Sequence, residues 1–511
     1  MSGGMNGAVR IFADYTGDVH ERADVVVVGS GPGGAVVAHG LAAAGHDVIL
    51  VEEGPPFTPD DFELDGARSM ARTLREGGLR ATRGYMLSTM QAIALGGGSL
   101  VNSAICVRSP QETLDGWCSD FALERTTRAD LDPHYDAVEK FLGIEPTPDD
   151  VQGDRNLLFR DGCNALGYSS EPIARNVRGC RGSGECFTGC RARAKQSMDI
   201  SYVPAAIAAG ARVLTSVQVQ QVTTAGRRAT GVAGQVARPF TGELSHRVRI
   251  EAKVVVLAAG CMATPVLLQR SGGLANASGQ AGENLQFHPG VAIMGVFPER
   301  THPEFGATQG YQSLQFIPEG FKLETLWAPP GVFAVRLPGI GTELKQRLAE
   351  IPYCAVWDAI ASCNRSLGRV RARRRGMDPA LHWRFDPQDV QILKRALQVL
   401  AELLFAAGAR KILPGVGRLP EEMHSLDEAE ALRRHDLRAD DLTCGGNHAF
   451  SSTRMHGDPH RGVVGEDGRC HDLDNLYVAD TGILPRSPAV NPMLTCMALA
   501  HRVAAGIAER I

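Results

Sequence analysis

Hydrophobic runs separated by glycine-rich turns organise the N-terminal part of the chain. Asp24–Val28 is a β-branched run with no polar residue after its first position, which predicts a parallel strand buried on both faces. A helix is expected over about Gly33–Ala44, where Gly45 ends it, and Asp47–Val51 repeats the strand pattern. This stretch therefore predicts a strand, a helix and a second strand in one unit.

The turn inside this unit carries the pattern of a dinucleotide site. A G-x-G-x-x-G sequence lets backbone N–H groups and a helix N-terminus approach a pyrophosphate, and here it consists of Gly29, Gly31 and Gly34. Glu52, 21 residues beyond Gly31, stands about where an acidic side chain binds ribose hydroxyls. No arginine adjoins Glu52, which disfavours NADP, so FAD or NAD is expected.

A second glycine-rich loop follows within Gln91–Arg108. Bare backbone and small polar side chains here predict contact with a flat or phosphorylated ligand. The residues concerned are Gly96, Gly97, Gly98, Ser99 and Asn102.

The glycine signatures stop between residues 290 and 440, and the pattern changes to strand-like runs with many aromatic residues. The aromatic residues include Phe305, Tyr311, Phe316, Phe321 and Trp327. Asp386-Pro387 predicts the start of a long amphipathic helix that ends at Gly408. This region is expected to form a second domain. Its aromatic content favours a hydrophobic or bulky substrate.

Composition narrows the class of protein. The chain has 511 residues, a net charge of -4, 22% charged and 44% hydrophobic residues, which is ordinary for a globular protein and does not favour a nucleic-acid partner. The N-terminus lacks a secretory signal, and no apolar run reaches the length of a transmembrane segment, so a cytoplasmic protein is expected. The twelve cysteines are then expected as thiols or metal ligands rather than a disulfide framework.

Three cysteines are spaced C-x5-C-x3-C in a glycine-rich loop, and they are Cys180, Cys186 and Cys190. Thiolates this close in sequence could bind zinc or an iron–sulfur cluster, and the basic residues that follow would lower their pKa values. Iron–sulfur centres generally need four ligands, whereas three are evident. Free thiols or one local disulfide are the alternative.

Four segments together resemble the glucose-methanol-choline (GMC) family of FAD-dependent oxidoreductases. Gln91–Arg108 is similar to the first family signature, and Val254–Gly272 is similar to the second. Ala281–Pro289 resembles a G-x-N-L-x-D-H-P motif, with Phe287 in place of the usual acid. The segment from Asn447 onward resembles the catalytic portion. The matches extend over almost the whole chain.

The resemblance implies an α/β fold with a Rossmann-like FAD-binding domain and an antiparallel substrate domain backed by helices. We expect residues 20–110, 200–290 and 441–511 to form the FAD-binding domain, residues 111–199 to connect, and residues 291–440 to bind substrate. Val101 stands where some relatives attach flavin through histidine, so non-covalent FAD is expected. The resemblance also places adenine at Val219, and the flavin phosphate and ribityl chain at Asp480 and Thr481.

The resemblance implies a catalytic pair near the C-terminus. His448 would take the proton of an alcohol as a base, and Asn491 would hold its oxygen while hydride passes to flavin N5. His456, where glycine is common, is expected to be structural.

The expected reaction is FAD-dependent oxidation of an alcohol to an aldehyde or ketone. The substrate would be a hydrophobic or bulky alcohol, and the cysteine loop favours a quinone-like or protein acceptor over oxygen. One alternative is the large subunit of a sugar or polyol dehydrogenase with an iron–sulfur cluster. Another is an FAD-containing hydroxynitrile-lyase-like enzyme.

Overall fold

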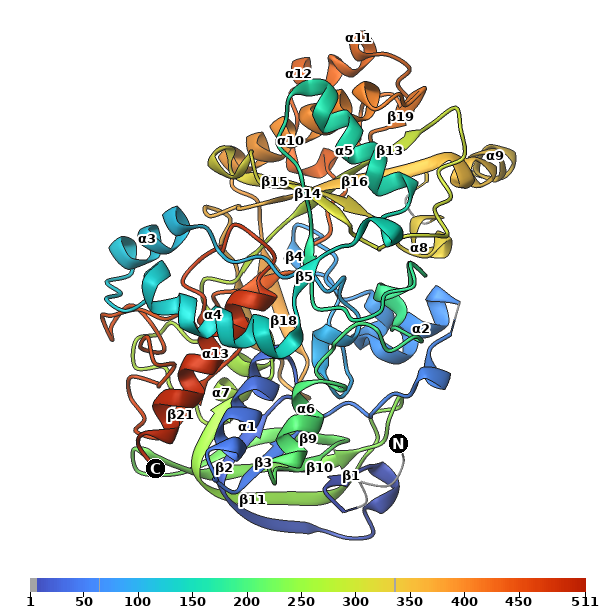
Figure 1. Cartoon of the computed structure of the whole chain (residues 1–511). Coiled ribbons are helices and arrows are strands. Elements are labelled where there is room, and N and C mark those ends of the chain that lie inside the picture. Colours follow the sequence, from blue (N-terminus) through green and yellow to red (C-terminus); the bar gives the residue numbers. More distant parts are fainter. Residues whose placement is uncertain (1–6, 64, 335–336) are drawn as a thin grey trace.

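The computed structural model describes residues 7–63, 65–334 and 337–511, and within these residues two large sheets dominate (Figure 1). The larger sheet has strand order β1-β8-β3-β2-β11-β10-β9, and β21 pairs with β11. Its strands are β1 (Val9–Arg10), β2 (Val19–Val28), β3 (Val48–Val51), β8 (Arg212–Leu214), β9 (Val217–Ala225), β10 (Arg228–Ala237), β11 (Leu244–Leu257) and β21 (Leu476–Val478).

The centre of this sheet is parallel and buried. β2 pairs in parallel with β3 and β11, and Val25, Val26 and Val27 have no exposed surface, as expected of a strand covered on both faces. Four helices pack beside it, with α1 against α6 and α13, and α13 against α4. They are α1 (Pro32–Ala43), α4 (Arg128–Leu142), α6 (Tyr202–Ala208) and α13 (Met493–Ala508). The predicted strand, helix and strand are thus confirmed.

β11 is a long strand that runs unbroken over 14 residues. On the edge opposite β2, the first part of β11 pairs with β10 and the later part pairs with β21.

The second sheet is antiparallel and has the order β19-β13-β16-β15-β14-β6. Its strands are β6 (Glu171–Pro172), β13 (Gly290–Val296), β14 (Tyr311–Ser313), β15 (Phe321–Leu326), β16 (Cys354–Ala361) and β19 (Lys411–Leu413). The predicted long helix is α10 (Pro387–Ala406), and Asp386 caps it by accepting a hydrogen bond from the Gln388 N–H. α10 and α5 (Asp154–Leu166) pack on each other and on this sheet, at the top of Figure 1.

Shorter elements connect the two sheets and cover their edges. The helices are α2 (Gly66–Thr73), α3 (Gln111–Asp120), α7 (Thr264–Arg270), α8 (Pro330–Ala334), α9 (Thr342–Glu350), α11 (Leu426–Ala429) and α12 (Ala431–Arg434). The strands are β4 (Arg83–Gly84), β5 (Glu145–Pro146), β7 (Ala174–Arg175), β12 (Gln286–Phe287), β17 (Arg369–Ala372), β18 (Pro379–Trp383) and β20 (Ala449–Phe450). The β12–β20 pair brings the segment before β13 beside the C-terminal segment.

The aromatic residues of the antiparallel domain serve its core. Tyr311, Phe316, Phe321 and Trp327 are at least 94% buried, whereas Phe305 is 43% exposed. None of these five side chains lines the large cavity described below. Aromatic content therefore reflects the packing of the sheet and does not identify a substrate.

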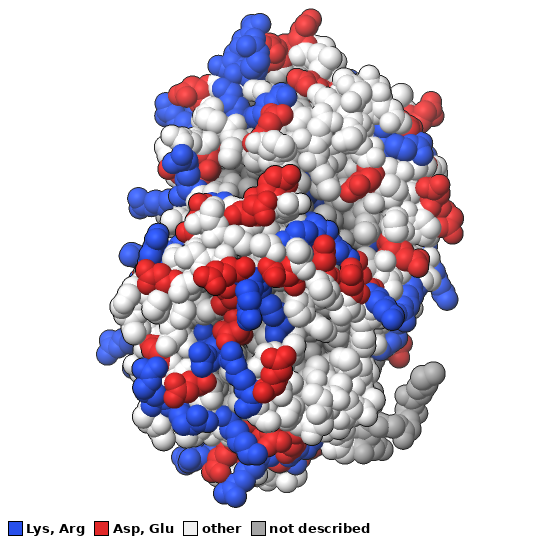
Figure 2. All heavy atoms as spheres, turned by 60° about the vertical axis from the view of Figure 1, so that its left-hand side comes forward, with Lys and Arg blue, Asp and Glu red and all other residues white. Residues whose placement is uncertain are grey.

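No helix among the described residues is both long and apolar enough to cross a membrane. Lys and Arg side chains are intermixed with Asp and Glu on the face in Figure 2.

Candidate active site

A cavity of about 960 Å³ lies between the two sheets. The carboxyl end of β2 and the second glycine loop line one end, and β15, β16 and the C-terminal segment line the other. Eleven of the predicted site residues face it: Gly29, Gly31, Glu52, Gly97, Gly98, Asn102, Val219, His448, Asp480, Thr481 and Asn491. Segments far apart in the sequence therefore meet at one site.

The two glycine loops lie in direct backbone contact. Gly97 has a φ of +54°, and a Cβ there would lie 2.7 Å from the Gly31 Cα. Gly29 has a φ of +101°, and its Cβ would lie 2.3 Å from the Ala258 carbonyl oxygen. Only glycine fits these two positions, and the resulting bare backbone fits a flat, phosphorylated group such as FAD.

Two predicted site residues, Gly34 and Ser99, do not line the cavity. Gly34 does not line the cavity, because it packs against the first turn, where a Cβ would lie 1.9 Å from the Gly29 carbonyl oxygen. Ser99 is 1% exposed, donates to the Gly96 carbonyl oxygen at 2.6 Å and accepts from the Met198 N–H at 2.9 Å. Its hydroxyl therefore holds the second loop rather than a ligand.

Glu52 lines the cavity, but its carboxylate also organises the first turn. Oε2 accepts from the Ser30 N–H at 2.9 Å and from the Ser30 hydroxyl at 2.6 Å, and Oε1 accepts from the Gly54 N–H at 2.8 Å. Burial raises the pKa of this carboxyl, while these hydrogen bonds oppose the rise. The role in binding ribose stays a prediction.

Glu53, beside it, is a cavity residue that the sequence analysis missed. Its carboxylate pairs with the Arg75 guanidinium, with Nη2 and Oε2 2.5 Å apart, and accepts from Gln218 Nε2 at 2.8 Å. The ion pair with Arg75 holds the pKa of Glu53 below its usual value although burial opposes it. In the sequence, Glu52 and Glu53 are adjacent acidic residues, and no local pattern shows that Glu53 also lines the cavity.

Asp480 is fixed at the carboxyl end of β21. Its Oδ2 accepts from the Gly260 N–H at 3.0 Å and from the Thr264 hydroxyl at 2.5 Å, and its Oδ1 accepts from the Gly482 N–H at 2.7 Å. Burial raises the pKa of this carboxyl. Asp480 thus joins the second family-like segment to the C-terminal segment at the cavity wall.

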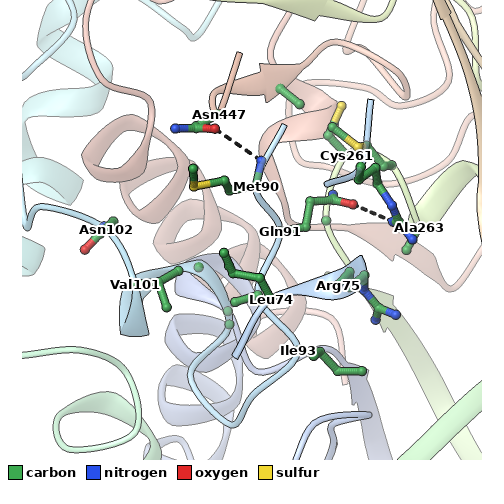
Figure 3. Close-up of a pocket in the computed structure, with 18 of the residues that line it drawn as sticks. Leu74, Arg75, Met90, Gln91, Ile93, Val101, Asn102, Cys261, Ala263 and Asn447 are labelled. Carbon is green, nitrogen blue, oxygen red and sulfur yellow. Dashed lines mark hydrogen bonds between the residues drawn. The ribbon is translucent and has the colours of Figure 1, made fainter. Parts of the chain in front are cut away.

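Val101 and Asn102, which follow the second glycine loop, lie at the cavity in Figure 3. Asn102 donates from Nδ2 to the Met493 sulfur at 2.9 Å, and Val101 beside it also lines the cavity. Across the cavity wall, Asn447 accepts from the Met90 N–H through Oδ1 at 3.1 Å. The side chain of Val101 offers no nucleophile for covalent attachment of flavin.

His448 lies against a second histidine, His288, which the sequence analysis did not select. Their Nδ1 atoms are 3.3 Å apart, and His288 Nε2 lies 2.6 Å from the Ser487 hydroxyl. Ser487 Oγ accepts from the Ala489 N–H at 3.1 Å and donates to Ser362 Oγ at 2.9 Å. His288 Nε2 must therefore donate to Ser487, which leaves its Nδ1 as an acceptor.

This chain of hydrogen bonds sets the tautomer of His448. Because His288 Nδ1 accepts, His448 Nδ1 carries the proton, and His448 Nε2 keeps its lone pair. Desolvation lowers the pKa of His448 to about 4, while Glu324 opposes this and Lys322 adds to it. A neutral imidazole with a free nitrogen thus stands at the cavity.

Asn491 is 5% exposed and contacts a buried lysine. Lys322 has no exposed side-chain surface, and its Nζ donates to Asn491 Oδ1 at 2.8 Å. Glu324, which lines the cavity, pairs with Lys322 at 2.8 Å and accepts from Gln309 Nε2 at 2.9 Å. The sequence signal was the two-residue spacing of Lys322 and Glu324 on an apolar strand, which puts both on one face.

Within the residues that the structure describes, the cysteine loop does not form the metal site that its spacing left open. Among the described residues, no group of three or more His, Cys, Asp and Glu side chains is arranged to hold a metal ion. Cys180, Cys186 and Cys190 line a separate cavity of about 20 Å³, and all three are free thiols. The Cys186 sulfur accepts from Arg175 Nη2 at 3.1 Å, and Arg175 together with Lys195 lowers the pKa of this thiol against the effect of burial. The structure therefore does not support an iron–sulfur cluster.

Comparison with known proteins identifies the family. Two models described as GMC oxidoreductase match residues 70–290 and 364–500, and one described as FAD binding domain matches residues 24–60. An uncharacterized GMC-type oxidoreductase of Mycobacterium tuberculosis is 34% identical over 492 residues, which cover 94% of this chain and 75% of the relative. The chain belongs to the GMC oxidoreductase family.

A further relative is similar over most of this chain, and a solved structure shares the fold. A long-chain-alcohol oxidase of Arabidopsis thaliana is 27% identical, over 96% of this chain and 68% of the relative. The fold matches that of pyridoxine 4-oxidase from Mesorbium loti with a TM-score of 0.72 at 18% identity, over 96% of this chain and 99% of that one. The predicted fold class is confirmed, and this GMC oxidoreductase is an FAD-dependent enzyme.

Proposed function

We propose that this GMC oxidoreductase oxidises the CH–OH group of a small-molecule alcohol to an aldehyde or ketone and uses oxygen as the electron acceptor. The observation that carries the proposal is the neutral His448 imidazole with a free Nε2, in the same cavity that Asn491 lines. The relative named long-chain-alcohol oxidase supports the same reaction.

The glycine end of the cavity is the proposed FAD site. The backbone at Gly29, Gly31 and Gly97 would hold the pyrophosphate side, Val219 would lie at adenine, and Asp480 with Thr481 would lie at the flavin side. Bound non-covalently, FAD would take up the hydride and pass the electrons to the acceptor.

The residues at the other end would move the proton. His448 Nε2 accepts the hydroxyl proton of the alcohol, which allows the carbon to release hydride. Asn491 binds the oxygen of the alcohol and fixes its orientation. His288 holds the His448 ring through Nδ1, which leaves Nε2 as the free nitrogen of a ring that lines the cavity.

The proposed acceptor differs from the sequence-based expectation. A non-oxygen acceptor was favoured because a cluster in the cysteine loop could carry electrons, and the described residues form no such ligand set. The relatives named oxidases support oxygen instead. Reduction of oxygen by two electrons would then yield hydrogen peroxide.

The lining of the cavity supports a bulky alcohol that also carries polar groups. Ala292, Leu326 and Ile360 are apolar, whereas Gln309 and Glu324 are polar. Gln309 donates to Glu324, and the two residues form a polar patch in the lining that polar groups of a substrate would contact and a plain alkyl chain would not. We therefore propose a bulky alcohol as the substrate, but not a purely hydrophobic one.

Anaerobic flavin reduction tests the function. The purified protein is mixed, without oxygen, with long-chain alkanols, sterols, amino alcohols and polyols, and the flavin absorbance is followed. Bleaching by one class identifies the substrate class, and readmitted oxygen should restore the absorbance with one hydrogen peroxide per turnover. If dithionite bleaches the flavin and no alcohol does, the proposed reaction is wrong, and acid–base chemistry of the lyase type becomes the better account.

A further inference from the structure

A fully buried lysine adjoins the proposed catalytic pair and has no role in the reaction as described so far. Lys322 lies on β15, and its ammonium contacts three oxygen atoms: Gln312 Oε1 at 2.6 Å, Asn491 Oδ1 at 2.8 Å and Glu324 Oε2 at 2.8 Å. An ammonium can only donate, and two of these contacts are hydrogen bonds, to Gln312 and Asn491, whereas the contact with Glu324 is an ion pair.

The neighbours of this ammonium have only one possible orientation. Gln312 donates from Nε2 to the Glu171 carboxylate at 2.8 Å, so its oxygen must face Lys322. The carboxylate of Glu171 can only accept and the ammonium of Lys322 can only donate, which fixes the Gln312 amide from both sides. The same rule requires that Asn491 turn its oxygen toward Lys322.

The consequence falls on the other end of the Asn491 amide. With Oδ1 held by Lys322, the Nδ2 group is the part of the amide left for a ligand, and Asn491 lines the cavity. In the part of the chain that the structure describes, Nδ2 donates to no protein acceptor. Asn491 therefore presents N–H donors, and not a carbonyl oxygen, to a bound alcohol.

We propose that Lys322 is a positioning residue that locks Asn491 as a hydrogen-bond donor to the substrate oxygen. The inference rests on the proposed alcohol oxidation. As His448 Nε2 removes the hydroxyl proton, negative charge develops on that oxygen, and a fixed N–H donor stabilises it. The nearby ammonium of Lys322 adds a favourable charge in a region with little water.

Glu324 makes the buried ammonium tolerable. Glu324 is 2% exposed and pairs with Lys322, and Gln309 donates to its other oxygen. A buried charge without such partners would cost several kcal/mol. The two residues should consequently be replaced together when the stability of the variant matters.

The test is a double-mutant cycle on anaerobic flavin reduction. Lys322→Met should lower the reduction rate about 100-fold, the loss typical of one oxyanion donor, with little change in the dissociation constant of the alcohol. Asn491→Ala should lower the rate by a similar factor. The Lys322→Met/Asn491→Ala variant should be no slower than the slower single variant, because Lys322 acts through Asn491.

A matched control separates positioning from stability. Lys411 is 8% exposed and pairs with Glu350 and Glu422, both at 2.9 Å, on β19. Lys411→Met should lower Tm as Lys322→Met does and leave the reduction rate unchanged. If Lys322→Met does not fold, Lys322→Met/Glu324→Gln removes both buried charges and enters the same cycle. Multiplicative effects of the Lys322 and Asn491 substitutions would overturn the proposal.

A crystal structure of Lys322→Met provides a readout that needs no substrate. The Asn491 side chain should change its χ angles or occupy two conformers once its oxygen is released. An unchanged Asn491 with the same hydrogen-bond partners at its oxygen would overturn the positioning role. If no alcohol reduces the wild-type flavin, the proposed function fails, and this structural result still decides the role of Lys322.

Discussion

The two ends of the cavity are built by different means. At the nucleotide end, the lining is mainly bare backbone, because Gly31 and Gly97 bring two loops into contact. The strand that leads to the first loop consists of valine from Val25 to Val28. At the substrate end, ionisable side chains lie inside an antiparallel sheet, as Lys322 and Glu324 show. The first end depends on the absence of side chains, and the second depends on their pairing.

The two ends of the cavity also differ in how far apart in the sequence their contacting residues lie. The turn at Gly29–Gly34 is a local structure that neighbouring residues specify. Asn491 and Lys322 are 169 residues apart, and His288 and His448 are 160 apart. Local patterns therefore describe the nucleotide end, whereas the substrate end needs long-range contacts. Each prediction below perturbs one of these ends.

The largest effect is expected from the base at the substrate end. His448→Ala should lower the rate of anaerobic flavin reduction by about 1,000-fold, because no other described group holds a free nitrogen at that position. Stopped-flow absorbance measures this rate. His456→Ala is the matched control, since His456 is 2% exposed and does not line the cavity. Equal losses in the two variants would contradict the assignment of the base.

Acid should destabilise the protein through its buried neutral histidines. Burial lowers the pKa of His448 from 6.5 to about 4 and also lowers that of His288, so the unfolded chain binds protons first as the pH falls. Stability should hold above about pH 6.5 and be lost as pH falls toward 4, by up to about 3 kcal/mol for His448 alone. Urea unfolding at pH 7.0, 5.5 and 4.5 measures the loss. The His448→Gln variant should show a shallower loss, and parallel curves would refute the linkage.

A smaller effect is expected at the nucleotide end. Gly97→Ala should raise the dissociation constant of FAD about tenfold, because its Cβ would meet the Gly31 backbone. Flavin fluorescence titration of the apoprotein measures this constant. Gly226→Ala is the control: its φ of +60° is similar, but its Cβ would meet no atom within 4 Å. FAD binding weakened alike by both substitutions would mean that backbone strain alone, without contact between the loops, accounts for the loss.

The smallest effect is expected from the cysteine loop, which belongs to neither end. Cys180→Ser should leave flavin reduction within about twofold of wild type, since the described residues provide no ligand set for a metal there. Iron and acid-labile sulfide analysis of the purified protein should find neither at stoichiometric level. Stoichiometric iron that disappears in Cys180→Ser would restore the cluster hypothesis and the non-oxygen acceptor with it.

The sequence by itself determined the parts of this protein that depend on near neighbours. The valine strand, the glycine turn and the long helix capped by Asp386 were predictable, because period, turn residues and caps act over a few positions. The resemblance to family motifs added His448 and Asn491, and both line the cavity. The FAD-binding class and the α/β fold followed from these segments.

Only the tertiary structure decided what lies between those segments. Most of the aromatic residues of the antiparallel sheet are buried in its core, and the Ser99 hydroxyl bonds within its own loop. The tautomer of His448 and the orientation of Asn491 depend on His288 and Lys322, which no local pattern connects to them. Hydrogen bonds of buried groups are set by the partners that folding brings close, and a linear pattern does not contain those partners.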